Sequence, residues 1–224
     1  RNKYKRQKPI PIPHQVITSR AELQEYFKLH NKAMNDVAIY TDGAYIRSGT
    51  RDIAGIGIYI EHKNEEWYYE EAIGEQPILY AEQLAICRIK ELLKCLEIKN
   101  EQKTRTFIMT DSQITFDGIF KETEKAKYPP LMKQMKELIS THNAHFAKIP
   151  SHEKNKYNQP DIEGNEKADA LAQSGRNRTQ QNRVRFADTK THSRCFHIKR
   201  LHQEVSREEY QGWTSQTRLV WDYH

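Results

Sequence analysis

The sequence predicts an α/β fold in which helices flank a mixed sheet of five strands. Two observations predict it: three strand-like runs follow one another with short connections, as in an antiparallel meander, and strands then alternate with amphipathic helices. This pattern spans residues 36–175. A basic N-terminal extension with a helix is expected at 1–35, and a basic linker and C-terminal tail at 176–224.

Runs of β-branched and aromatic residues predict the five strands. They lie at 37–41, 53–62, 65–73, 104–112 and 144–151. The first strand is expected to end at Asp42, because Gly43 follows and Asp-Gly is a common turn dipeptide. Asp111 is expected at the end of the fourth strand. Each of these acids is therefore either a turn former or a ligand-binding group at the end of a rigid strand.

Apolar residues three and four positions apart predict the helices. The helices lie at 20–34, 79–97, 128–142 and 162–175. Ser19, with Glu22 three residues later, forms a capping-box pattern before the first helix. Gly175 is expected to end the last helix.

Charge and cysteine content narrow the class of protein. The chain has 36 Lys and Arg against 30 Asp and Glu, a net charge of +6, which favours a polyanionic partner such as nucleic acid. Of the three cysteines, Cys87 and Cys95 lie two turns apart on one predicted helix, too far to form a disulfide. We therefore expect an intracellular protein of the cytoplasm or nucleus. No apolar run approaches membrane-spanning length, so no membrane partner is expected.

Four acids lie at strand ends or on helix faces. At each position the acid is either an ordinary turn-forming or solvated residue or part of a functional site. Asp42 and Asp111 follow strands, Glu82 lies on the apolar stripe of its helix, and Asp169 shares a helix face with Asn165. Brought together, these carboxylates would repel one another unless divalent cations lay between them. Oxygen ligands without Cys or His suit Mg²⁺, with Mn²⁺ able to substitute. Two such ions can support an in-line displacement at phosphorus.

Four motifs in this order resemble those of a type I ribonuclease H domain. They read "IYTDGAY", "LYAEQLAI", "MTDSQ" and "IEGNEKADALA". Their details are most similar to the ribonuclease H domains of non-LTR retrotransposon reverse transcriptases. The resemblance spans the predicted α/β domain and implies the five-stranded ribonuclease H-like sheet and an endonuclease that cuts the RNA strand of an RNA–DNA hybrid.

The resemblance also implies roles for the four acids. Asp42 would bridge two Mg²⁺ ions. Asp169 would help to hold the ion that activates the attacking water. Glu82 and Asp111 would help to hold the ion at the leaving oxygen.

Further site residues follow from the same resemblance. Gln113, with Ser112 and Asn165, would contact the nucleic acid. His152 would assist proton traffic or product release, although the Gly common after this histidine is replaced by Glu153, so a histidine of an ordinary surface loop is the alternative. Where many members carry a polar stretch before the catalytic Glu, residues 77–80 read "PILY".

Two features outside these motifs leave alternatives open. A zinc site is one interpretation of a His and Cys cluster, but its spacing does not match paired finger ligands. The cluster consists of His192, Cys195, His197 and His202. The basic segments 1–8 and 176–190 are either solvated tails or phosphate-contacting arms.

The function predicted is a metal-dependent endoribonuclease that cleaves the RNA strand of RNA–DNA hybrids, as the ribonuclease H part of a retroelement reverse transcriptase. Its partners would be the hybrid and the polymerase region of a larger polyprotein. One alternative is a catalytically silent hybrid-binding or scaffolding domain of a larger polymerase or nucleoprotein complex. Another is an integrase-like relative that acts on DNA.

Overall fold

The computed structural model describes most of the predicted domain and parts of both flanking segments. The described residues are 14–49, 51–96, 98, 104–120, 127–142, 144–151, 162–181, 196–200 and 203–204. Among their helices, none combines the length and the apolar character needed to cross a membrane.

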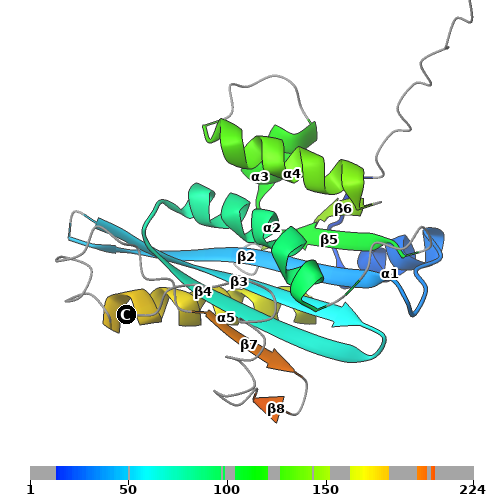
Figure 1. The fold of residues 1–224 in the computed structure, drawn as a ribbon. Coiled ribbons are helices and arrows are strands. Elements are labelled where there is room, and N and C mark those ends of the chain that lie inside the picture. Colours follow the sequence, from blue (N-terminus) through cyan, green and yellow to red (C-terminus); the bar gives the residue numbers. More distant parts are fainter. Residues whose placement is uncertain are drawn as a thin grey trace, which may run out of the picture.

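Helices lie on both faces of one mixed sheet (Figure 1). The strands are β1 (His14–Val16), β2 (Val37–Ser48), β3 (Arg51–His62), β4 (Glu65–Glu75), β5 (Thr106–Thr110), β6 (Ala144–Lys148), β7 (Phe196–Arg200) and β8 (Gln203–Glu204). The helices are α1 (Arg20–Leu29), α2 (Ile78–Cys95), α3 (Gln113–Phe120), α4 (Pro129–Thr141) and α5 (Glu163–Gln181). The predicted α/β fold is confirmed.

The five predicted strands form the centre of the sheet. In the described residues the strand order is β1-β6-β5-β2-β3-β4-β7-β8. β2, β3 and β4 pair antiparallel, which confirms the meander, whereas β2, β5 and β6 pair parallel. Short strands from the two flanking segments extend the sheet: β1 pairs with β6, and β7 pairs with β4.

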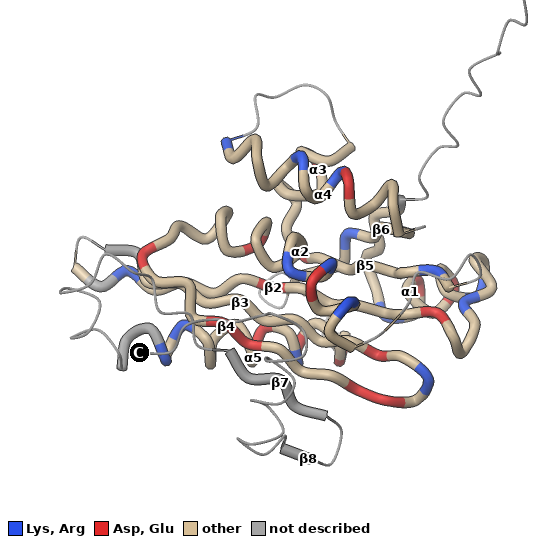
Figure 2. The backbone as a smooth tube through the Cα atoms, viewed as in Figure 1, with Lys and Arg blue, Asp and Glu red and all other residues tan. Residues whose placement is uncertain are grey.

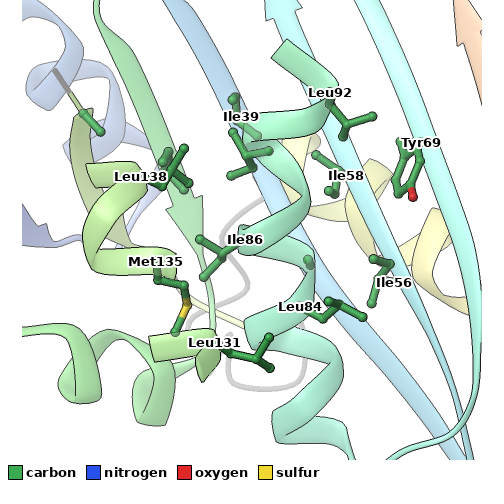
Figure 3. Close-up of a cluster of buried hydrophobic side chains, with 14 of the residues drawn as sticks. Ile39, Ile56, Ile58, Tyr69, Leu84, Ile86, Leu92, Leu131, Met135 and Leu138 are labelled. Atoms are coloured by element: carbon green, nitrogen blue, oxygen red, sulfur yellow. The ribbon is translucent and has the colours of Figure 1, made fainter. Parts of the chain in front are cut away.

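Two apolar clusters pack on opposite faces of the sheet. On one face, α2 lies between α4 and the sheet, and side chains such as Ile39, Ile86 and Met135 are fully buried (Figure 3). On the other face, α5 and α1 cover residues of alternate parity, including Tyr40 and Phe107. Because side chains alternate along a strand, each central strand contributes to both clusters.

The prediction that β2 ends at Asp42 was wrong. The strand continues to Ser48, with Asp42 opposite Gly57 of β3. Gly43 serves a close approach and not a turn, since a Cβ at this position would lie 2.8 Å from the backbone nitrogen of Glu82. Glycine therefore lets α2 pack directly against the strand.

The prediction that Gly175 ends the last helix was also wrong. α5 continues to Gln181, so part of the expected linker is helical. A Cβ at Gly175 would lie 2.6 Å from the carbonyl oxygen of Glu71, so this glycine lets the helix backbone touch β4. Two smaller differences concern α1, which ends at Leu29, and α3, which the sequence did not predict.

Candidate active site

One cavity of about 370 Å³ collects all four predicted acids. Asp42 comes from β2, Glu82 from α2, Asp111 from the residue after β5, and Asp169 from α5. The structure thus brings together groups that are up to 127 positions apart in the chain. The predicted nucleic-acid contact Asn165 lines the same cavity.

The end of β5 creates the opening in which these side chains meet. β2 and β5 pair only as far as Thr41 opposite Thr110. Asp42 follows Thr41, and Asp111 follows Thr110. The alternation of side chains along each strand places both acids on the face of the sheet that α5 covers. Beyond this point β2 continues with β3 as its partner, so the acids lie beside a strand that remains rigid.

Asp42 is the most enclosed of the four acids, with 9% of its surface exposed. Its Oδ1 accepts a 2.7 Å hydrogen bond from the backbone N–H of Gly43. Burial raises the pKa of Asp42 well above its ordinary value, and the neighbouring charges of Asp111 and Asp169 raise it further. The carboxylate therefore lies where a negative charge needs a cation.

Glu82 reaches the cavity from the helix on the opposite face. The hydroxyl of Ser112 donates a hydrogen bond to its carboxylate, and Ser112 Oγ lies 2.9 Å from Thr115 Oγ1. Burial raises the pKa of Glu82 to about 7; Asp111 adds to the rise, and the hydrogen bond from Ser112 opposes it. The expectation that this acid on an apolar stripe points toward the sheet is confirmed.

Asp111 and Asn165 form the side of the cavity next to β6. Burial raises the pKa of Asp111, while a hydrogen bond from the Asn165 side chain and the charge of Lys148 oppose the rise. Asn165 is 4% exposed, and its Oδ1 has no hydrogen-bond partner. An unsatisfied buried oxygen beside a carboxylate is a further acceptor in need of a cation or donor.

α5 is anchored at its N-terminal end, which positions Asn165 and Asp169. Lys167 Nζ donates to Tyr59 Oη at 3.1 Å and to Glu66 at 3.2 Å, and lies 4.4 Å from the centre of the Tyr59 ring. A Cβ at Gly164 would collide with the ring of Tyr40. Ion pairing, a cation–π contact and close packing thus hold this end of the helix against the sheet.

The donor set fits divalent cations, although the carboxylates are turned toward protein donors. Asp169 Oδ2 accepts a 2.8 Å hydrogen bond from Gln173 Nε2, and Glu82 accepts from Ser112. As these side chains stand, the described residues contain no group of three His, Cys, Asp or Glu side chains that could hold a metal ion. The fit rests on the chemistry of the cavity: oxygen donors only, mutual repulsion that raises pKa values, and the unpartnered oxygen of Asn165.

A family model for RNase H matches residues 34–177. The chain belongs to the ribonuclease H family. The matched segment contains all four acids and all the other residues described as lining the cavity.

Solved structures of ribonuclease H proteins also match. The RNase H1 of the halophilic archaeon Halobacterium salinarum shares 20% identity, with 62% of this chain and 96% of that chain covered and a TM-score of 0.46. LC11-RNase H1, isolated from compost by a metagenomic approach, matches in its complex with an RNA/DNA hybrid at 23% identity, 65% and 99% coverage, and a TM-score of 0.47. The RNase H domain of prototype foamy virus shares 22% identity, with 63% of this chain and 94% of that chain covered and a TM-score of 0.48. No curated protein sequence matches the chain.

Two other predicted site residues that the structure describes, Ser112 and Gln113, do not line the cavity. Ser112 is buried and bonded to Glu82, and Gln113 is exposed as the first residue of α3, where its Nε2 donates to Asp117 at 2.8 Å. His152 lies outside the described residues, as do His192, Cys195 and His202 of the possible zinc cluster. Only the backbone of His197, in β7, is described. Their roles stay predictions.

Sequence reasoning missed four polar or aromatic residues of the cavity wall: Tyr45, Ser151, Gln173 and Arg176. Tyr45 was missed because β2 was expected to have ended before it. Gln173 and Arg176 are four and seven residues after Asp169, a spacing that places all three on one face of a helix. The signal was present, but the helix was expected to end before Arg176.

Proposed function

We propose that this chain is a metal-dependent endoribonuclease that cleaves the RNA strand of RNA–DNA hybrids and leaves 3′-hydroxyl and 5′-phosphate ends. The observation that carries the proposal is the cavity in which carboxylates from β2, α2, α5 and the end of β5 meet. Within the described part of the chain, none of these acids has an ion pair of the kind that Arg105 forms with Asp36 and Arg88 forms with Glu71. Membership of the ribonuclease H family supports the substrate class.

The proposed cofactor is a pair of Mg²⁺ ions, with Mn²⁺ able to substitute. When bound, two such ions activate the attacking water and stabilise the leaving oxygen. Asp42 is the residue proposed to contact both, because its pKa is raised by all three of the other acids, Asp111, Asp169 and Glu82. Asp169 would serve the side of the attacking water, and Glu82 with Asp111 the side of the leaving oxygen.

Other residues of the chain would hold these acids in place. The Ser112 hydroxyl orients Glu82, and the Asn165 side chain bonds Asp111 while its own Oδ1 remains free for a further partner. The anchored N-terminal end of α5 fixes Asn165 and Asp169 relative to the sheet. A rigid arrangement of this kind lowers the barrier only if it matches the geometry of the transition state.

Selectivity for RNA is proposed to come from the backbone and not from base identity. The described lining of the cavity is dominated by charged groups suited to metal ions and the phosphate backbone, so cleavage should depend little on sequence. The 2′-hydroxyls of an A-form-like duplex are displayed across its minor groove. Gln113 can both donate and accept a hydrogen bond to such a group.

The proposal is tested by incubating the chain with RNA–DNA hybrid, duplex RNA and duplex DNA in Mg²⁺ and separating the products on a denaturing gel. Cleavage of the RNA strand of the hybrid alone is expected. Efficient cleavage of duplex DNA would favour the integrase-like alternative. Tight binding of the hybrid without cleavage, in both Mg²⁺ and Mn²⁺, would assign the chain to the silent hybrid-binding class.

We further propose that the chain is the ribonuclease H part of a retroelement reverse transcriptase, of the non-LTR type, with a polymerase region as its partner. The supporting observation is the form of the motifs "LYAEQLAI" and "GNEKADALA". The coding sequence on either side of this chain tests the proposal. A polymerase region upstream is expected, and a stand-alone reading frame would contradict it.

A further inference from the structure

Arg176 is a cation in the wall of a cavity that is otherwise acidic. It lines the same cavity as the four carboxylates and is half-buried. Among the described residues, its guanidinium is bonded to neutral acceptors: Nη1 lies 3.5 Å from the carbonyl oxygen of Tyr45, and Nε and Nη2 lie 3.3 and 3.2 Å from Asn177 Oδ1. Within the described part of the chain, no carboxylate lies at ion-pair distance from Arg176.

Arg178 and Arg88, by contrast, are each paired with an acid. Arg178, two residues further along α5, lies 2.5 Å from Glu70, and Arg88 lies 2.8 Å from the buried Glu71. Arg176 thus retains a positive charge and several N–H groups that neutral, long contacts hold only weakly. Figure 2 shows the Lys and Arg positions in blue along the backbone, α5 included.

The backbone beneath Arg176 is fixed by contact between α5 and the sheet. A Cβ at Gly55 of β3 would lie 2.0 Å from the backbone nitrogen of Arg176. A Cβ at Gly175 would in turn meet the backbone of Glu71 in β4. Two glycines therefore let the helix lie directly on the strands, and the long side chain leaves from a rigid position.

Arg176 shares its helix face with Asp169 and Gln173. The three residues follow at positions i, i+4 and i+7, and all three line the cavity. Asp169, proposed to serve the attacking water, and the cation of Arg176 thus lie along one stripe of the helix. The Gln173 amide lies between them. A polyanion that enters the cavity meets both.

We propose that Arg176 binds a backbone phosphate of the RNA–DNA hybrid next to the site of cleavage. The inference rests on the proposed function, because the hybrid is the substrate assigned there. A guanidinium presents a planar fork of N–H groups that matches two phosphate oxygens. A fixed cation in this wall also offsets the repulsion between the substrate and four carboxylates. When the hybrid binds, a phosphate takes the place of the Tyr45 carbonyl and the Asn177 amide as the hydrogen-bond acceptor of the Arg176 guanidinium, because the charged phosphate is the stronger acceptor.

The test measures hybrid binding by fluorescence anisotropy without divalent ions, so that it does not depend on cleavage. Arg176→Gln is expected to weaken binding about threefold to tenfold at low salt and to make the slope of log K against log[salt] shallower by about 1. Arg176→Lys should retain the slope, because it keeps the charge, but recover only part of the affinity, because it loses the fork. Lys28→Gln, an exposed charge on α1, is the matched control and should change neither quantity.

A neutral methylphosphonate placed at successive positions of the hybrid identifies the phosphate. At one position the loss caused by Arg176→Gln should disappear, and at the others it should persist. A wild-type slope and affinity in Arg176→Gln would overturn the inference, as would a fall in Tm of more than a few degrees, which would make Arg176 a structural residue. Failure of the proposed function is distinguishable, because it would appear as absence of cleavage by the wild-type chain.

Discussion

Asp36 and Asp42 are buried carboxylates at the two ends of the parallel part of β2, and their surroundings are opposite. Asp36, 1% exposed, accepts hydrogen bonds from the backbone N–H groups of Ala33 at 2.7 Å and Arg105 at 2.9 Å, and its Oδ2 lies 2.6 Å from Arg105 Nη2. Burial alone would raise its pKa, but these bonds outweigh burial and hold the pKa of Asp36 below its ordinary value. Asp42 has one backbone donor and three acidic neighbours, and its pKa is raised.

The comparison separates buried acids that complete the fold from buried acids that await a ligand. Glu71 belongs with Asp36: it is 1% exposed, pairs with Arg88, and accepts from the Tyr69 hydroxyl at 2.7 Å. Removing one partner of a buried ion pair strongly destabilises the folded protein, because the other charge is left buried without compensation. A buried carboxylate that is left among like charges takes up a proton more readily, or is stabilised by a cation that binds beside it.

The largest expected effect is the loss of cleavage in Asp42→Asn. The change keeps the shape of the side chain but removes a charge proposed to contact both ions. A loss of several kcal/mol in transition-state stabilisation corresponds to at least about a thousandfold in rate. Single-turnover cleavage of a labelled hybrid in Mg²⁺ measures it.

The same variant has a second expected outcome. Metal-free Asp42→Asn should melt no lower than the metal-free parent, because it relieves repulsion among the acids. Near-normal turnover in Mg²⁺ would remove Asp42 from the active site.

Asp36→Ala is expected to give the reverse pattern. It leaves the Arg105 guanidinium and two backbone N–H groups without their acceptor, which costs about 2–3 kcal/mol. For a chain of this size, Tm should fall by roughly 5–10 °C. Cleavage per folded molecule should be retained, as measured at a temperature well below both transitions. A selective loss of turnover would show that Asp36 acts on the site.

The contribution of Glu82 to the stability of the metal-free protein should fall as pH rises from about 4.5 to about 7, against an opposite contribution from His145, whose pKa burial lowers to about 4. Glu82 has its pKa raised to about 7 by burial, so over this range the folded state binds more protons than the unfolded state. The cost of ionising Glu82 in the folded state amounts to about 3 kcal/mol above pH 7. Asp36, whose pKa is lowered, contributes stability that is lost only below about pH 4.

Urea denaturation in EDTA at pH 5 and pH 8 measures this difference, with Glu82→Gln as the comparison. Between the two conditions the variant should lose the destabilisation that Glu82 supplies, while the contributions of other groups with shifted pKa values, such as Asp42 and His145, remain. An equally steep dependence in Glu82→Gln would place its origin in other groups.

Gln113→Ala is expected to have the smallest effect. The loss of one hydrogen bond to the nucleic acid is worth about 1 kcal/mol, or several-fold in cleavage of the hybrid. Gln113 is exposed and its amide is bonded only to Asp117, so stability should not change. Asp117→Ala frees the same amide without removing it and serves as the control. Abolished cleavage in Gln113→Ala would mean that the residue acts at the reacting centre.

The order of strands and helices and the four acids could be predicted from the sequence, because both follow from local patterns. Glu82 illustrates this: an acid on an apolar stripe is a local observation, and its burial confirmed it. The continuation of β2 past Asp42 could not be predicted. The dipeptide Asp-Gly by itself does not distinguish a turn from a strand. Only the close approach of α2 shows that Gly43 is not a turn residue.

The same limit applies to α5 and to the added strands. Gly175 looks like a helix terminator until the backbone of β4 is seen against it. The pairing of β7 with β4, and of β1 with β6, joins segments that local periodicity cannot relate. Arg176 was missed for this reason, because its importance depends on where the helix ends.

The cover that α1 provides over the sheet has a practical consequence for anyone who trims this protein. The rings of Tyr26 and Phe27 pack on Phe107 of β5, at 6.0 and 5.5 Å between centres. A fragment cut to the segment that matches the family, which begins at residue 34, would lose this helix together with β1. Phe107 would then face solvent, and β6 would become an unpaired edge open to strands of other molecules. Such a fragment should aggregate while retaining all four carboxylates of the proposed active site, so an inactive preparation would be a failure of solubility and not of chemistry.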